Sequence, residues 1–239
     1  EVLEPIGKRL KGVRIDSGDI AYLSKKCREL LNEAGLTDCS IVASNSLDEF
    51  IITDLLDQGS ELDSFGVGER LITAKSEPVF GCVYKLVAIE KEGEIIPKIK
   101  LSENEKITNP GYKKVWRLYD KKTHNPIADV VTLANEVIDD TKPYTIFDEV
   151  HVWKKKKITN FYAKNLQVPI FLNGECVYES PKLDEIRSYC KNQVDNLWGE
   201  VKRFTNPHSY YVDLSAELWN CKQDLISQFS FKDGAQSIE

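Results

Sequence analysis

Hydrophobic positions in the first third of the chain switch regularly between the alternating pattern of a strand and the spacing of a helix. The β-branched run GVRID at 12–16 is followed by apolar residues at helical spacing over 19–34. The switch recurs with the strand-like CSIVAS at 39–44 and the helical LDEFIITDLLDQG at 47–59, and ELDSFGVG at 61–68 predicts a third strand. This order is typical of a parallel sheet or a β/α barrel, in which ligands bind at the carboxyl ends of the strands.

After Pro78 the periodicity changes to short alternations of apolar and polar residues. Turn signals at 91–94, 109–111 and 121–126 separate these runs. A β-rich region is therefore predicted from about residue 80 to residue 175.

The helical period returns after Ser180. An amphipathic helix is predicted over 183–204 and a second helix over 215–229. We therefore expect three parts, a barrel-like α/β part at 1–79, a β-rich region at 80–178 and a helical segment at 179–239.

Composition excludes several classes of protein. Hydrophobic residues make up 41% and charged residues 29% of the 239 residues, so the chain can bury a sizeable core. The formal net charge of -6 argues against a nucleic acid or a membrane surface as the main partner, because such surfaces need clustered Lys and Arg.

Targeting signals are absent from the sequence. No apolar stretch reaches the roughly 18 to 20 residues that span a bilayer and no signal peptide opens the chain, so a cytoplasmic location is expected. The sequence has no methionine, and its opening, EVLEPIGKRLKGVRID, has the pattern of a helix end that runs into a strand. We therefore expect the chain to begin inside a larger protein.

The cysteines lack the spacing of a metal or redox motif. No two of them form a CxxC pair, so a zinc ribbon is not indicated and free thiols are favoured over a disulfide framework. The cysteines are Cys27, Cys39, Cys82, Cys176, Cys190 and Cys221.

Candidate chemistry gathers at the first junction of strand and helix, residues 16–19 (Asp-Ser-Gly-Asp). One interpretation is a helix cap, in which Asp16 or Ser17 accepts a backbone N–H and Asp19 favours the positive end of the helix dipole. Capping does not explain Arg14, which shares a strand face with Asp16. In a central strand both side chains point to the barrel interior, where an unpaired guanidinium is costly. Either the two pair with each other and with nearby groups, or Arg14 binds an anion and Asp16 binds hydroxyl groups.

A second candidate is the glycine turn at 66–68 (Gly-Val-Gly). A dinucleotide fingerprint needs a further glycine at position 71, which is Leu71, so that interpretation fails. A phosphate group needs only converging backbone N–H groups free of Cβ interference, and the loop after a late barrel strand is a usual place for it. Ser44 and Asn45 add a polar edge at the end of the preceding strand. Three adjacent strand ends therefore suit a phosphorylated sugar.

Several motifs resemble those of the nicotinate phosphoribosyltransferases. They are GVRIDSGDIAYLSKK at 12–26, IVASNSLDEF at 41–50, FGVGERLIT at 65–73, GCVYKLVAI at 81–89 and NPHSYYVDLSAELWNCKQDLI at 206–226. The resemblance runs from about residue 8 to residue 228 and covers the C-terminal half of such an enzyme. It implies an α/β fold that combines part of an irregular β/α barrel of the type II phosphoribosyltransferases with a β-rich region and C-terminal helices.

The resemblance also implies an activity. Enzymes of this family join nicotinate to 5-phosphoribosyl-1-pyrophosphate, giving nicotinate mononucleotide and pyrophosphate, with ATP hydrolysis as the driving reaction, in a salvage step toward NAD. Magnesium is implied by the pyrophosphate and ATP chemistry, not by a cluster of ligands in the sequence. A homodimer with sites at the subunit interface is implied as well.

Individual residues take roles through the same resemblance. Arg14 matches an arginine that faces nicotinate, where a planar fork suits the carboxylate. Asp16 matches the acid near the ribose hydroxyls, in a motif that continues with Ser17 and Gly18. The positions that match loops around the ribose 5-phosphate are Ser44, Asn45, Gly66, Val67, Gly68 and Glu69. Glu69 departs from the family, which has a small hydroxyl residue there, and its carboxylate repels phosphate unless the side chain turns away.

The histidine that ATP phosphorylates in this family lies upstream of the first residue and matches no position here. His124, His151 and His208 fall in the β-rich or C-terminal parts and are interpreted as surface or packing residues. We therefore expect the chain to be catalytically incompetent by itself while belonging to an active enzyme.

Two other features are interpreted as structural. The run Lys154 to Lys157 is assigned to a solvated loop rather than to an ATP or polyanion site. The tryptophans, which are assigned to packing, are Trp116, Trp153, Trp198 and Trp219.

Two alternative functions stay open. One is a related phosphoribosyltransferase that uses nicotinamide or quinolinate; quinolinate has two carboxylates and calls for more than one basic residue, whereas the predicted strands offer only Arg14. The other is a non-catalytic module used for binding or dimerisation. The full-length reading frame would separate the enzyme from the module.

Overall fold

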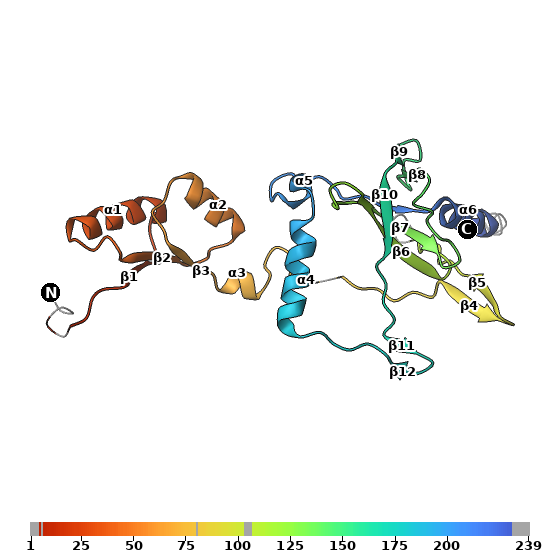
Figure 1. Ribbon diagram of the computed structural model, residues 1–239, viewed down its shortest axis with the longest axis horizontal. Helices are drawn as coiled ribbons and strands as arrows, with labels where there is room; N and C mark the ends of the chain where they lie inside the picture. The colour runs from red at the N-terminus through yellow and green to blue at the C-terminus, as the bar shows by residue number, and fades with distance from the viewer. Residues whose placement is uncertain (1–4, 6, 80, 103–106, 231–239) are drawn as a thin grey trace, which may run out of the picture. The chain divides into compact units, whose positions relative to one another are not determined.

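The computed structural model describes residue 5 and residues 7–79, 81–102 and 107–230. The chain divides into two compact units, Glu1–Val83 and Tyr84–Glu239 (Figure 1). This boundary lies close to the change of periodicity after Pro78, while the further division at residue 178 stays a prediction. No helix in the described part of the chain is long and apolar enough to cross a membrane.

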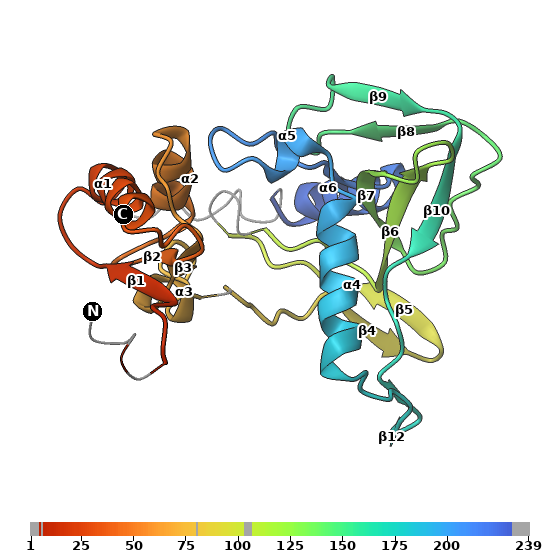
Figure 2. The same ribbon diagram turned by 60° about the vertical axis from the view of Figure 1, so that its left-hand side comes forward.

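The first unit is a parallel sheet with helices on one face. Its strands, in spatial order, are β1 (Gly12–Ile15), β2 (Ser40–Ser44) and β3 (Ser64–Gly66). The helices α1 (Ile20–Glu33) and α2 (Glu49–Asp57) connect these strands and lie on the same side of the sheet, and the short helix α3 (Glu69–Ile72) follows β3 (Figure 1, Figure 2). The predicted order of strand, helix, strand, helix and strand is confirmed.

Alternation along the strands decides which face the helices cover. Ile15, Ile41 and Ala43 are buried against apolar residues of the two helices. The opposite face takes the residues between them, which are Gly12, Arg14, Ser40, Val42, Ser44, Ser64 and Gly66. These residues belong to no hydrophobic cluster of the described part, and most are small or polar.

Both long helices of this unit begin at an aspartate. The Asp19 carboxylate accepts a hydrogen bond from the Tyr22 backbone N–H at 3.0 Å, and Asp48 accepts from the N–H groups of Phe50 and Ile51. The interpretation that Asp16 or Ser17 caps the first helix is therefore wrong. The cap lies nearer the helix, so Asp16 and Ser17 stay in the loop between strand and helix.

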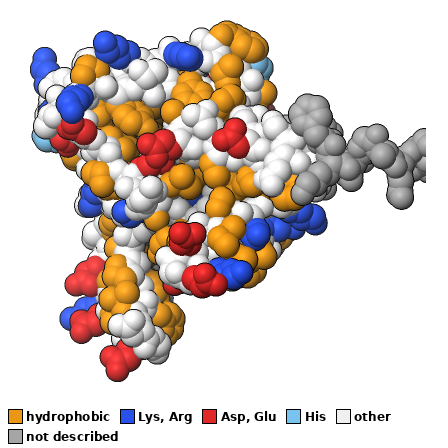
Figure 3. All heavy atoms as spheres, turned by 90° about the vertical axis from the view of Figure 1, so that its right-hand side faces the viewer, with side chains coloured by type: hydrophobic (Ala, Val, Ile, Leu, Met, Phe, Trp, Pro, Cys, Tyr) orange, Lys and Arg blue, Asp and Glu red, His pale blue; other side chains and the backbone are white. Residues whose placement is uncertain are grey.

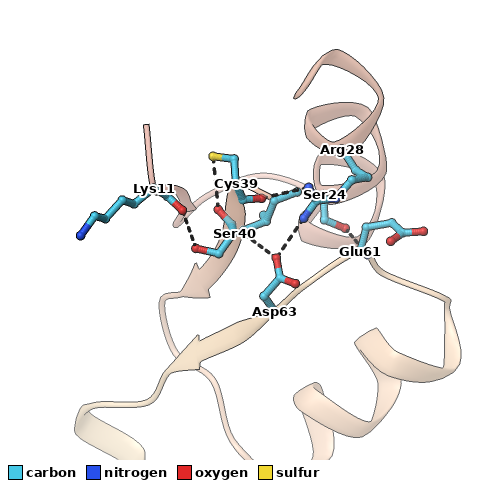
Figure 4. A network of polar contacts seen from close by, with 8 residues as sticks. Lys11, Ser24, Arg28, Cys39, Ser40, Glu61 and Asp63 are labelled. Carbon is cyan, nitrogen blue, oxygen red and sulfur yellow. Dashed lines mark hydrogen bonds and ion pairs between the residues drawn. The ribbon is translucent and has the colours of Figure 1, made fainter. Parts of the chain in front are cut away.

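A polar network closes the amino-terminal edge of the sheet (Figure 4). Arg28 of α1 donates to the Cys39 carbonyl oxygen and to the Asp63 carboxylate, both at 2.9 Å. Asp63 also accepts from the Ile41 N–H at 2.7 Å, and the Ser40 hydroxyl donates to the Lys11 carbonyl oxygen at 3.0 Å. These bonds connect α1 to the starts of the strands. They do not involve the carboxyl edge of the sheet, where folds of this kind bind ligands.

The second unit is built on a sheet with the strand order β10, β6, β7, β13. These strands are β6 (Lys113–Asp120), β7 (Pro126–Leu133), β10 (Phe161–Asn165) and β13 (Val212–Leu214). β6 pairs antiparallel with β10 and with β7, whereas β13 pairs parallel with β7. A strand close to the C-terminus thus completes the sheet, and helix α6 (Ala216–Ser230) contacts β7.

Two-stranded hairpins accompany this sheet. They are β4 (Ala88–Lys91) with β5 (Glu94–Pro97), β8 (Tyr144–Phe147) with β9 (Lys155–Ile158), and β11 (Phe171–Leu172) with β12 (Glu175–Cys176). The expected β-rich region is present, although within the alternating run 81–90 only the end is a strand. The lysine run is exposed, as predicted, but three of its residues belong to β9 and not to a loop.

The single helix predicted over 183–204 is two helices, α4 (Leu183–Asp195) and α5 (Gly199–Lys202). Trp198 has an extended backbone, with φ -63° and ψ 149°, and Gly199 is a poor helix former. The Lys156 ammonium lies 5.7 Å from the centre of the Trp198 ring and 5.3 Å from that of Tyr211. This contact between distant segments stabilises the extended conformation of Trp198, at a position where the periodicity of the sequence predicts an unbroken helix.

Asp213 of β13 is buried, and only 7% of its surface is exposed. Burial, together with the nearby charges of Asp148 and Glu149, raises the pKa of this carboxyl group to about 6. The folded chain therefore binds this proton more tightly than the unfolded chain does. The contribution of Asp213 to stability is fully present below about pH 4 and is lost as the pH rises through 6.

We expect Asp213→Asn to match the wild-type free energy of unfolding at pH 4 and to exceed it by about 2 kcal/mol at pH 8. The amide cannot ionise, so it escapes the penalty that the carboxylate meets in the folded state. Urea denaturation of both proteins at the two pH values measures the difference. Other carboxylates are common to both proteins, so a difference that does not grow with pH would show that Asp213 is ionised at little cost.

Candidate functional site

The carboxyl edge of the first sheet brings Arg14, Asp16 and Ser44 together. Arg14 donates from Nη1 to the Ser44 hydroxyl at 2.8 Å and from Nη2 to Asp16 Oδ2 at 2.9 Å. The Arg14 and Asp16 side chains are 62% and 50% exposed, so solvent reaches both. β1 is an edge strand of the described sheet, not a central one. The guanidinium is thus paired with nearby groups and is also open to an incoming anion.

The loop after β2 has an unusual backbone. Asn45 and Ser46 have φ angles of 85° and 53°, in the left-handed region that non-glycine residues seldom adopt. The Ser46 hydroxyl donates to Asn45 Oδ1 at 3.3 Å. Residues with such backbone angles occur preferentially at ligand sites. Two of them in succession at the end of a parallel strand therefore make this loop a candidate site.

The glycine turn lies beside this loop. Gly66 pairs with Ser44 in the register of β2 and β3, and a Cβ on Gly66 would stand 3.3 Å from the Cβ of Ser44. A side chain at position 66 would therefore crowd the strand end. Gly68 opens α3 and faces open space. Because Gly66 and Gly68 have no Cβ, they do not obstruct the backbone N–H groups of residues 67–69. Phosphate binding requires unobstructed N–H groups of this kind.

The residues around this turn include one contact that the sequence did not predict. Arg70 of α3 forms an ion pair with Asp48, the residue that caps α2. Hydrogen bonding from the Ile51 N–H and the charge of Arg70 lower the pKa of the Asp48 carboxyl group. Glu69 is the first residue of α3, and its carbonyl oxygen accepts from Thr73. The sequence did not identify Arg70 as a site residue, because an arginine in a short helical run is ordinarily a surface residue.

The predicted site residues thus fall along one edge. These residues lie at strand ends, in loops and at the start of α3 in the first unit: Arg14, Asp16, Ser17, Gly18, Ser44, Asn45, Gly66, Val67, Gly68 and Glu69. Hydrogen bonds join Arg14 to both Asp16 and Ser44, while Gly66 lies opposite Ser44. Gly18 has φ of 74° and turns the chain into α1, so its place in the motif also has a backbone reason.

The histidines lie in the second unit and contact aromatic rings. His124 lies 3.4 Å from the Tyr162 hydroxyl, His151 packs edge-on against Trp153, and His208 packs edge-on against Tyr211. This agrees with surface or packing roles. Within the described residues, no three His, Cys, Asp or Glu side chains gather as a metal ion would require, and the cysteines are free.

Several curated proteins similar to this chain are named nicotinate phosphoribosyltransferase. Residues 112–222 match the model of the nicotinate phosphoribosyltransferase C-terminal domain. Nicotinate phosphoribosyltransferase from Bacillus subtilis is 44% identical over 230 residues, which are 95% of this chain and 47% of that protein. The protein of that name from Dictyostelium discoideum is 35% identical over 93% of this chain and 40% of its own length, and that from Homo sapiens is 31% identical over 90% and 41%. The chain thus spans less than half the length of these curated relatives.

Two solved structures with different enzyme names are also similar to this chain. The crystal structure of human nicotinic acid phosphoribosyltransferase superposes with a TM-score of 0.69 at 26% identity, over 92% of this chain and 41% of that one. The crystal structure of nicotinate-nucleotide pyrophosphorylase from Pyrococcus furiosus gives a TM-score of 0.52 at 26% identity, over 82% and 42%. Over the part of these relatives that it spans, the chain is therefore similar to the nicotinate phosphoribosyltransferases, and its residues 112–222 match their C-terminal domain.

Proposed function

We propose that this chain supplies the phosphoribosyl-binding edge of a nicotinate phosphoribosyltransferase. In the reaction, the ring nitrogen of nicotinate attacks C1 of 5-phosphoribosyl-1-pyrophosphate, the bond from C1 to the pyrophosphate oxygen breaks, and nicotinate mononucleotide and pyrophosphate form. The observation that carries the proposal is the solvent-accessible Arg14, held by Asp16 and Ser44 beside the Gly66 turn. The match to relatives of that name supports it.

Each group at the edge suits one part of the substrates. The Arg14 guanidinium offers a planar fork for the nicotinate carboxylate. The Asp16 carboxylate, followed by Ser17 and Gly18, accepts hydrogen bonds from ribose hydroxyls. The groups proposed to hold the 5-phosphate belong to Ser44, Asn45, Gly66, Val67, Gly68 and Glu69, mainly through backbone N–H groups. Glu69 contributes its N–H while its carboxylate points away from the phosphate.

We further propose that the first sheet is part of an irregular β/α barrel. Parallel sheets are normally covered on both faces, yet within the described part of the first unit both long helices, α1 and α2, lie on one face of β1, β2 and β3. The other face, with Arg14 and Ser44, has the small and polar residues expected of a barrel interior that admits a ligand. Further strands outside this chain would complete the wall.

ATP and magnesium enter the proposal as reactants. ATP hydrolysis would drive the reaction through a histidine upstream of this chain. Magnesium would be bound mainly by phosphate oxygens, because in the described part of the chain the acidic residues form no group that could hold it. The cytoplasm is the proposed location, as the place of a salvage step toward NAD.

A homodimer is proposed as the working form. In the second unit, apolar side chains appear among charges of both signs on the face seen in Figure 3. α4 has no buried residue, although Leu183, Ile186 and Tyr189 recur on it at helical spacing. Exposed apolar surface of this kind is typical of protein interfaces.

The test uses the intact protein that contains this segment, mixed with 5-phosphoribosyl-1-pyrophosphate, ATP and magnesium. Formation of nicotinate mononucleotide from nicotinate is the expected result. Product from nicotinamide or quinolinate alone would move the protein to a related phosphoribosyltransferase. Absence of product with every base would favour the non-catalytic module and overturn the proposal.

A further inference from the structure

The ion pair between Arg70 and Asp48 joins two loops that follow neighbouring strands. Asp48 ends the loop that starts at Ser44, and Arg70 follows the Gly66–Gly68 turn by two residues. The Asp48 side chain is only 17% exposed and that of Arg70 is 27% exposed. Solvent therefore screens their attraction less than it would that of a surface pair. The two loops are therefore held to each other by a partly buried contact.

Asp48 uses its two carboxylate oxygens for different tasks. Oδ1 accepts from the N–H groups of Phe50 and Ile51 and so starts α2, while Oδ2 accepts from Arg70. One side chain thus fixes the start of α2 and the position of α3. A shift of α3 would move the glycine turn, because the Leu71 and Ile72 N–H groups bond to the Gly68 carbonyl oxygen.

We propose that Arg70 is a positioning residue, which through Asp48 holds the Ser44–Asp48 loop and the Gly66–Glu69 turn at the spacing at which both contact the substrate 5-phosphate. This inference rests on the proposed function and goes beyond it, because it assigns the preorganisation of the phosphate site to a contact that itself touches no substrate. Preorganised N–H groups bind an anion better than groups that must be brought together on binding.

A direct role of Arg70 in binding phosphate is the competing explanation. In the structure its guanidinium is engaged by Asp48, whose negative charge neutralises it. An arginine that binds phosphate directly would act best without this partner. The two explanations therefore predict opposite effects of removing the Asp48 charge.

The test measures the steady-state kinetics of the intact enzyme with Arg70→Met and Asp48→Asn, singly and combined. Asn keeps an oxygen that can cap α2, since Asn and Asp are comparable N-caps, but it loses the charge that pairs with Arg70. Met keeps the apolar length of the arginine side chain. Arg9→Met, which breaks the pair of Arg9 with Asp38 before the sheet begins, is the matched control.

We expect each single variant to raise KM for 5-phosphoribosyl-1-pyrophosphate by about ten-fold, with kcat and KM for nicotinate nearly unchanged. The double variant should be no worse than the singles, because all three lack the same contact. Arg9→Met should behave as wild type. A merely structural role would lower activity in all parameters together with thermal stability.

Besides that structural outcome, three results would overturn the inference. If Asp48→Asn leaves KM unchanged or lowers it while Arg70→Met raises it, Arg70 binds phosphate directly. If both variants behave as wild type, the ion pair positions nothing. If the double variant loses the product of the two single effects, the residues act separately. A wild-type enzyme without activity would instead refute the proposed function, so the two failures are distinguishable.

Discussion

Arg14→Ala is expected to lower kcat/KM for nicotinate by about 100- to 1,000-fold in the intact enzyme, the largest effect we predict on activity. The variant removes the guanidinium fork and leaves Asp16 without the partner that donates to it at 2.9 Å. An unpaired carboxylate near the ring site then repels the carboxylate of nicotinate. Steady-state kinetics with nicotinate varied at saturating 5-phosphoribosyl-1-pyrophosphate measure the loss.

Two further variants sharpen this result. Arg14→Lys keeps the charge but loses the fork, so we expect it to fall between wild type and Arg14→Ala. Arg9→Ala removes an arginine that pairs with an aspartate away from the site and should leave nicotinate kinetics unchanged. If Arg14→Ala weakens only the phosphoribosyl substrate, the guanidinium faces the phosphates and our assignment of the ring site is wrong.

Asp129→Ala is expected to destabilise the second unit by about 3 to 5 kcal/mol, the largest effect we predict on stability. Asp129 accepts hydrogen bonds from Arg117 Nε and Nη2, both at 2.8 Å, and from the Tyr210 hydroxyl at 2.9 Å. The Asp129 side chain is 11% exposed and that of Arg117 is 21% exposed. Alanine would leave a nearly buried guanidinium and a phenol without their acceptor, which costs more than the pair itself contributes.

Urea denaturation followed by circular dichroism measures this change. The combined replacement Arg117→Met with Asp129→Leu should cost less than Asp129→Ala alone, because it removes both charges and keeps the apolar volume. If the single variant unfolds at the wild-type urea concentration, water reaches Arg117 and the pair contributes little.

Local patterns predicted much of the first unit. The spacing of Ile15, Ile41 and Ala43 follows the period of a half-covered strand, and these side chains are buried as that period requires. The same period put Arg14 and Asp16 on one face, where the structure pairs them. What the pattern could not supply was the register between strands, which brings Ser44 to Arg14 and opposite Gly66.

Contacts between distant segments account for most of what the sequence did not predict. β13 is three residues long and enters the sheet beside β7, some eighty positions earlier in the chain, so no local signal could announce it. The break after α4 depends on Trp198 and the Lys156 ammonium, which lie in separate elements. The Arg70 pair with Asp48 likewise joins residues that only the folded sheet brings together.

The aspartate caps have an evolutionary consequence. Because Asp19 and Asp48 start the helices, most positions between each strand and its cap have little part in folding. The exceptions are Gly18, whose backbone angle fixes its identity, and Leu47, which is buried in the core. Mutational drift at the other positions therefore removes few folding contacts. Substitutions at the carboxyl edge can therefore change ligand specificity without unfolding the sheet and its helices. Because different residues support folding and ligand binding, the fold can evolve new specificities.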